Sequence, residues 1–116
     1  MDTLAKYRKY LGRKVNVVID RPLGSKHPKF ETVYESNYGY VAGTVAGDGK
    51  EIDAYVLGLD EPVETYHGMC IAVIRRSNDV EHKLVVSDKP LPMEEIRSRT
   101  NFIERYFETE IEVFDV

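Results

Sequence analysis

Hydrophobic and polar residues alternate in several short stretches of the chain, as they do in β-strands that bury one face. In residues 14–20, Val15, Val17 and Ile19 lie on the same face. The same pattern predicts strands at 37–41, 52–59, 69–75 and 83–87, and the tail at 110–116 predicts a closing strand with an imperfect period.

Residues 93–107 follow the longer period of a helix. Met93, Ile96, Ile103 and Phe107 form one hydrophobic stripe. Asn101 interrupts this stretch and is a point at which the helix could divide into two pieces.

The order of these elements predicts the fold class. Short strands close in sequence, with turn residues between them, favour an antiparallel barrel over a parallel sheet, which would need helical crossovers. We predict a mainly β protein: a small five-stranded antiparallel barrel with a C-terminal helix, in one domain of 116 residues.

Composition indicates whether the chain folds, which partners it could bind and in which compartment it would be found. Hydrophobic residues make up 42% of the chain and charged residues 31%, a balance typical of folded proteins. The formal net charge of -4 argues against nucleic acid as a partner. The single cysteine, Cys70, lies in an apolar run, so we expect a buried thiol and a reducing compartment. Without a signal peptide or a membrane-spanning run, we expect a cytoplasmic protein and no membrane partner.

Acidic residues gather at two turns. Asp48, Glu51 and Asp53 occupy the first turn, and Asp79 and Glu81 occupy the second. A barrel that brings the turns together would collect these carboxylates at one rim, where hard divalent ions such as Mg²⁺ would balance their charge. The alternative is that exposed turns simply carry solvated acids.

Other candidate chemistries have weaker support. His67 and Cys70 are three residues apart in a predicted strand, so their side chains would face opposite sides; a shared zinc ion would need a loop there, and the sequence offers no second ligand pair. Ser25 and His27 lack the sequence context of a hydrolytic triad.

The stretch NYGYVAGTVAGDGKEIDAYV resembles the signature of the family I soluble inorganic pyrophosphatases. VVIDRP, in which Asp20 stands in the place of a family glutamate, NDVEHKLV and FIERYF are also similar to motifs of that family, so the resemblance runs from about Val15 to Phe107. It implies an OB-type barrel, Mg²⁺ or Mn²⁺ as cofactor, self-association into a homo-oligomer, and hydrolysis of pyrophosphate to two phosphates by a two-metal mechanism.

The resemblance also implies roles for individual residues. Asp48, Asp53 and Glu81 would hold the metal that carries the attacking water, and Asp79, or else Asn78, would help to hold a further metal.

Substrate binding is implied for a second group of residues. Lys83, Tyr38 and Tyr106 take the positions of phosphate-site residues of the family. Lys29, with Lys26 as an option, takes that of a family lysine. Because a hairpin that normally supplies an arginine is missing, the candidate replacements are Lys26, Lys29, Arg75 and Arg76.

Two positions depart from the family pattern. Lys50 stands where the family has the aspartate that takes the proton from water, and Phe107 stands where it has a lysine. A charged lysine cannot accept a proton, but its ammonium could sit among the acids as a fixed cation and leave Glu51 or the metal-bound water itself to manage the proton. The other interpretation is that Lys50 points into solvent.

Three functions follow from these observations. The first, which we favour, is a pyrophosphatase, slow or shifted toward a related phosphoanhydride. The second is a non-catalytic relative that senses a phosphate or nucleotide ligand. The third is an OB-fold module for single-stranded nucleic acid, against which the acidic balance argues.

Overall fold

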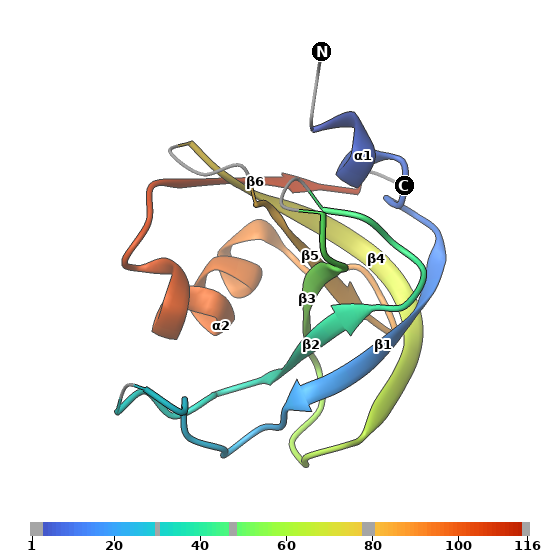
Figure 1. Cartoon of the computed structure of the whole chain (residues 1–116). Coiled ribbons are helices and arrows are strands. Elements are labelled where there is room, and N and C mark those ends of the chain that lie inside the picture. The colour runs from blue at the N-terminus through green and yellow to red at the C-terminus, as the bar shows by residue number, and fades with distance from the viewer. Residues whose placement is uncertain (1–3, 30, 47–48, 78–80, 115–116) are drawn as a thin grey trace.

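Six strands and two helices make up the regular structure of the part of the chain that the computed structural model describes, namely residues 4–29, 31–46, 49–77 and 81–114. Figure 1 shows a curved sheet with the longer helix against its outside. In chain order the elements are α1 (Ala5–Arg8), β1 (Lys14–Arg21), β2 (Asn37–Val41), β3 (Ile52–Val56), β4 (Thr65–Arg76), β5 (Lys83–Ser87), α2 (Met93–Glu104) and β6 (Thr109–Val113).

The long strand β4 closes the barrel. The strand order is β1-β2-β3-β5-β4-β6, and the first half of β4 also pairs with β1, from Lys14↔Met69 to Val18↔Thr65. The second half of β4 pairs with β6. Strands β1 to β5 therefore form a closed barrel, as predicted, and β6 extends the sheet without closing it.

One strand pairing differs from the predicted antiparallel arrangement. Strands β3 and β5 run parallel, with Ala54 opposite Leu84 and Val56 opposite Val86. A parallel pair needs a crossover. Here the strand β4 provides it, so the absence of a helix in this stretch did not exclude a parallel pair.

Several predicted boundaries also change. Strand β3 ends at Val56, shortly before Gly58 turns the chain with φ 97°. Strand β4 begins earlier than predicted, at Thr65, because its first residues pair with β1. Helix α2 continues through Asn101. Its buried residues are Ile96, Thr100, Phe102 and Glu104, whereas Met93 is 45% exposed, so the predicted stripe was wrong at this position.

The barrel separates two hydrophobic cores. The inner core fills the barrel with small and branched residues such as Val17, Ala54 and Leu84. The outer core lies between the sheet and α2 and includes Tyr55 and Phe102. The functional groups described below share the outer face with this second core.

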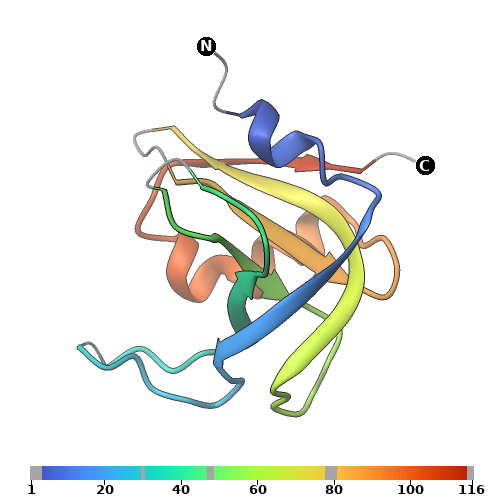
Figure 2. The ribbon, with the colours of Figure 1, turned by 45° about the vertical axis from the view of Figure 1, so that its right-hand side comes forward.

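Helix α1 covers one end of the barrel, beside β4 and β6 (Figure 2). Tyr7 is buried in the inner core, and Arg8 Nη2 lies 2.6 Å from Glu112 Oε1 of β6. Neither described helix has the length and apolar character needed to cross a membrane.

Candidate functional site

A buried lysine lies at the centre of the candidate site. Lys83 begins β5 and is only 4% exposed. Its Nζ lies 2.7 Å from Asp53 Oδ2 and 3.7 Å from Glu81 Oε1. Asp53 comes from β3 and Glu81 from the turn before β5, so two acids that are distant in sequence meet at one ammonium group.

A tyrosine hydroxyl completes this cluster. Tyr38 Oη of β2 donates a hydrogen bond of 2.9 Å to Asp53 Oδ2. Burial, together with the charge of Asp53, raises the pKa of Tyr38 well above its usual range, so the hydroxyl keeps its proton. The next residue must be glycine, because a Cβ on Gly39 would lie 1.8 Å from the Val18 carbonyl oxygen of β1. Tyr38, its neighbour in the strand, packs against the outer core.

A second buried cation lies nearby. Arg76, near the end of β4, donates two hydrogen bonds to Glu104 of α2, at 3.0 Å from Nε and 2.7 Å from Nη2. The Tyr55 hydroxyl also donates to Glu104, and the Arg76 guanidinium carbon lies 3.7 Å from the Phe107 ring centroid. Burial alone would lower the pKa of the Arg76 guanidinium. The hydrogen bonds and negative charge of Glu104 have the larger combined effect, so this pKa is raised.

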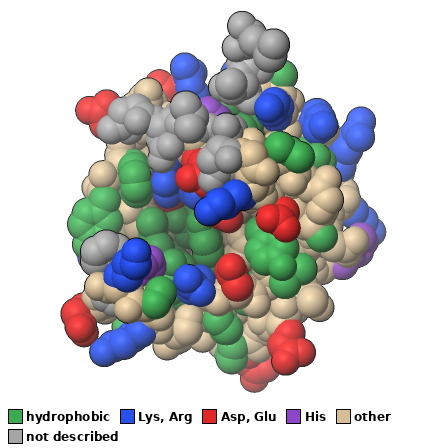
Figure 3. Space-filling model, in the orientation of Figure 1, with side chains coloured by type: hydrophobic (Ala, Val, Ile, Leu, Met, Phe, Trp, Pro, Cys, Tyr) green, Lys and Arg blue, Asp and Glu red, His purple; other side chains and the backbone are tan. Residues whose placement is uncertain are grey.

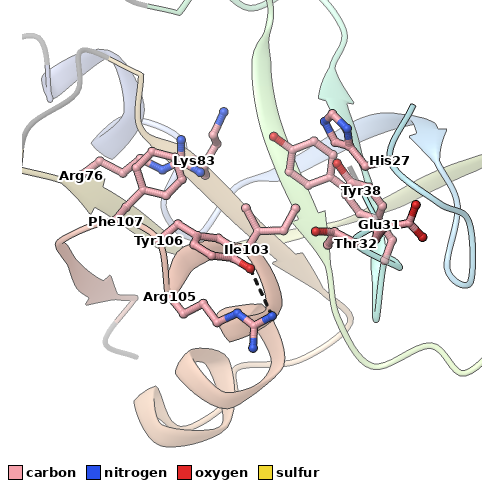
Figure 4. Close-up of a pocket in the computed structure, with 11 residues that line it drawn as sticks. His27, Glu31, Thr32, Tyr38, Arg76, Lys83, Ile103, Arg105, Tyr106 and Phe107 are labelled. Atoms are coloured by element: carbon pink, nitrogen blue, oxygen red, sulfur yellow. Dashed lines mark hydrogen bonds between the residues drawn. The ribbon is translucent and has the colours of Figure 1, made fainter. Parts of the chain in front are cut away.

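Of these groups, Tyr38, Lys83, Arg76 and Phe107 border a cavity of about 780 Å³. Figure 3 shows a hollow on this face with hydrophobic side chains in it and basic side chains at its edge. In Figure 4, residues of the loop before β2 lie on one side, and residues at the end of α2 lie on the other. The lining residues are His27, Glu31, Thr32, Tyr34, Tyr38, Arg76, Lys83, Ile103, Arg105, Tyr106 and Phe107.

Comparison with solved structures relates this architecture to known proteins. An inorganic pyrophosphatase from Ehrlichia chaffeensis matches with a TM-score of 0.70 and 19% identity, over 90% of this chain and 88% of that one. One from Neisseria gonorrhoeae matches with a TM-score of 0.62 and 21% identity, over 82% of this chain and 74% of that one. One from Helicobacter pylori matches with a TM-score of 0.62 and 17% identity, over 88% of this chain and 84% of that one. The fold is that of the inorganic pyrophosphatases.

The sequence itself shows no such match. No protein-family model and no curated protein matches the chain. At the identities given above, the likeness concerns the pyrophosphatase fold alone.

The structure brings together four of the predicted site residues, Tyr38, Asp53, Glu81 and Lys83. Asp20 is close enough for its charge to interact with that of Asp53. The pKa of Asp20 is raised, first by partial burial and then by Asp53, against the opposing charge of Arg21.

Other predicted site residues lie farther out. Lys50 and Glu51 are both exposed, in the turn before β3. Lys26 forms an exposed ion pair of 3.2 Å with Glu31, and Lys29 is exposed. Tyr106 lines the cavity while 67% exposed, and its hydroxyl accepts a hydrogen bond of 3.3 Å from Arg105. Three residues of the predicted metal site lie outside the described residues: Asp48, Asn78 and Asp79.

Of the four candidates for the missing arginine, only Arg76 lines the cavity. Arg75 points to the opposite, exposed face, as the alternation of a strand predicts.

Sequence reasoning missed Glu104, and in the loop before β2 it identified Lys26 and Lys29 but not the residues that line the cavity. A signal for Glu104 existed, because Ile96, Thr100 and Glu104 follow one another at intervals of four and all three are buried. An acid on the buried face of a helix predicts a buried partner. For His27, Thr32 and Tyr34, no sequence pattern indicated proximity to the barrel face.

The described carboxylates fit the chemistry of a divalent ion in part. Among residues 4–29, 31–46, 49–77 and 81–114, no group of three acidic, histidine or cysteine side chains is arranged to hold a metal. Asp53 and Glu81 nevertheless approach one cationic group with carboxylate oxygens, the ligands that Mg²⁺ prefers. Residues of both acidic turns therefore face the same point.

Proposed function

We propose that this chain hydrolyses inorganic pyrophosphate to two phosphates in the presence of Mg²⁺ or Mn²⁺. One observation carries the proposal: Asp53, Glu81 and Tyr38 surround the Lys83 ammonium at the edge of a cavity. The shared fold of the inorganic pyrophosphatases supports it.

Cationic and hydroxyl groups would bind the substrate. The Lys83 ammonium borders the cavity and would attract phosphoryl oxygens, whereas the Arg76 guanidinium on the same wall is already bound by Glu104. The Tyr38 hydroxyl, which remains protonated, would redirect its single hydrogen bond from Asp53 to one of those oxygens when Asp53 binds metal. These contacts would orient the phosphorus atom for in-line attack.

Acidic groups would bind metal and accept a proton. Asp53 and Glu81, with Asp48, Asp79 and Asp20, are the proposed ligands, and divalent ions bound there would make water more acidic and neutralise charge on both phosphoryl groups. In the reaction, a water oxygen forms a bond to one phosphorus and the bond from that phosphorus to the bridging oxygen breaks. Lys50 cannot take the released proton while charged, so the proton would pass to Glu51 of the same turn or to solvent water.

The test is phosphate release from pyrophosphate with Mg²⁺, with Mn²⁺ and with a chelator, in the parent and in Asp53→Asn. We expect turnover that needs the metal, and at least about a hundredfold loss of kcat/KM in the variant. Asp60→Asn is the matched control, because Asp60 is an exposed acid just beyond β3. Equal turnover in Asp53→Asn and Asp60→Asn would disprove the proposed site.

A non-catalytic phosphate sensor is the second candidate. It is favoured by Lys50, which stands in the acidic turn in place of an acid, and by Lys83, which already neutralises Asp53. Metal-dependent binding of pyrophosphate without turnover in the parent protein would support this function over hydrolysis.

A further inference from the structure

The cavity is much larger than a pyrophosphate ion requires. Its volume of about 780 Å³ lies within the range of roughly 300–1,000 Å³ that is typical of sites for small organic ligands. Lys83 and Tyr38, the groups suited to phosphate, form only part of its wall, with the Lys83 Nζ 6.0 Å from the centroid of the Tyr38 ring. The remaining wall is therefore available to a part of the ligand other than its phosphates.

That remaining wall has the wrong chemistry for an inorganic anion. Ile103 and the ring of Tyr106 lie together at the end of α2, and Figure 4 shows Phe107 beside them. These apolar surfaces can contribute to affinity only if the ligand carries an apolar or aromatic group. Pyrophosphate carries neither, whereas an ester of diphosphate with an organic alcohol does.

The exposed aromatic side chain is held in place. Tyr106 is 67% exposed, its ring centroid lies 5.2 Å from the Arg105 guanidinium carbon, and its hydroxyl accepts the bond from Arg105 Nη2. A held ring with an accessible face is a stacking surface for a planar group. The guanidinium beside it can stack on the same group.

The opposite wall is polar and aromatic. It contains His27, Glu31, Thr32 and Tyr34, and the rings of His27 and Tyr34 lie nearly parallel, with centroids 6.4 Å apart and an interplanar angle of 11°. Hydroxyl, carboxylate and imidazole groups suit the heteroatoms of a base and the hydroxyls of a ribose. An isoprenoid chain would be matched by a uniformly apolar wall instead.

We propose that the substrate is a nucleoside diphosphate or triphosphate, with its phosphates at Lys83 and its base against Tyr106 and Ile103. This inference rests on the proposed function, because it uses the same phosphate site. It adds a base-binding wall and makes Tyr106 and Ile103 specificity-determining residues.

The experiment compares two ligands that cannot be hydrolysed. Methylenediphosphonate stands for pyrophosphate, and the α,β-methylene analogue of ADP stands for a nucleotide. Isothermal titration of the full chain with Mg²⁺ gives a dissociation constant for each. We expect the nucleotide analogue to bind at least about tenfold more tightly, in the range of one base–aromatic stack.

Variants separate the ring of Tyr106 from its hydroxyl. Tyr106→Ala should reduce the ratio of the two affinities to near one, and Ile103→Ala should reduce it by a smaller factor. Tyr106→Phe keeps the ring and should keep the ratio. Met93→Ala, at an exposed position at the other end of α2, is the control and should also keep it.

The outcomes distinguish this inference from the proposed function. If methylenediphosphonate binds and the nucleotide analogue binds no more tightly, the nucleotide inference is wrong and the phosphate site stands. If neither ligand binds, both fail. Tight nucleotide binding that Tyr106→Ala leaves unchanged would also overturn the inference, as would stronger binding of a non-hydrolysable isoprenoid diphosphonate.

Discussion

The two buried ion pairs of the outer face differ in one respect. The cations are equally inaccessible, with exposed side-chain fractions of 6% for Arg76 and 5% for Lys83. Their acids are not: Glu104 is 5% exposed, whereas Asp53 is 31% exposed. The Arg76–Glu104 pair, here called the sealed pair, is buried on both sides. In the Lys83–Asp53 pair, here called the open pair, the acid is accessible to solvent, metal or substrate.

This difference separates a contact that holds the fold together from one that belongs to the proposed ligand site. Glu104 accepts hydrogen bonds from Arg76 and Tyr55, and the Phe107 ring packs on the guanidinium, so this pair attaches α2 to the barrel. Asp53 accepts bonds from Lys83 and Tyr38 at the edge of the cavity. A ligand can therefore reach Asp53 and compete with Lys83 and Tyr38 for it while α2 stays packed on the barrel.

Removing the acid of the sealed pair should have the largest effect on stability. Glu104→Ala leaves the Arg76 charge buried without this carboxylate, and we expect a loss of about 3–5 kcal/mol in the free energy of unfolding. Urea denaturation followed by circular dichroism measures it. The control is Glu95→Ala on the same helix, whose exposed pair with Arg99 should contribute under about 1 kcal/mol. A loss no greater than that of Glu95→Ala would mean that the pair does not fix α2.

Removing the cation of the open pair should cost less stability and more function. In Lys83→Met, Asp53 is left at a position that water reaches, so we expect a loss of about 1–3 kcal/mol, smaller than for Glu104→Ala. Binding of methylenediphosphonate should weaken strongly in the same variant. Lys89→Met, at an exposed position just after β5, is the control. Unchanged ligand binding in Lys83→Met would remove Lys83 from the phosphate site.

An exposed pair gives the smallest effect and a pH dependence. Hydrogen bonding from Arg8 lowers the pKa of Glu112 below its ordinary value of 4.5. The stabilisation is therefore present above that value and is lost as the pH falls through the lowered pKa. We expect Glu112→Gln to reduce stability at neutral pH by under about 1 kcal/mol and to weaken the decline in acid. The measurement is the free energy of unfolding of parent and variant at several pH values. If the two plots of this free energy against pH run parallel through the acid range, the prediction is contradicted.

The sequence predicted the barrel because alternation of apolar residues is a local signal. Strands at 14–21, 37–41 and 83–87 were found within a residue of their bounds, and Cys70 is buried as expected, with burial raising the pKa of its thiol to about 12. The parallel pairing of β3 and β5 was not found, because it depends on β5 entering the sheet between β3 and β4.

The candidate site was predictable in its chemistry and not in its shape. The motifs that contain Asp53 and Lys83 indicated a phosphate and metal site, and the barrel does bring these two residues together. The cavity depends instead on how the loop before β2 and the end of α2 face each other, which no periodicity records. Glu104 and Arg76 form a pair only because α2 packs on that face of the barrel.

The parallel pairing of β3 with β5 also bears on how the protein folds. Asp53 and Lys83 lie on these two strands, 30 residues apart, and they meet only when β5 has entered beside β3. Because non-local pairings form more slowly than hairpins, the proposed ligand site should mature after the β1–β2 and β2–β3 hairpins have formed. A chain stopped short of this pairing would contain every reactive group and still lack the place where they act together.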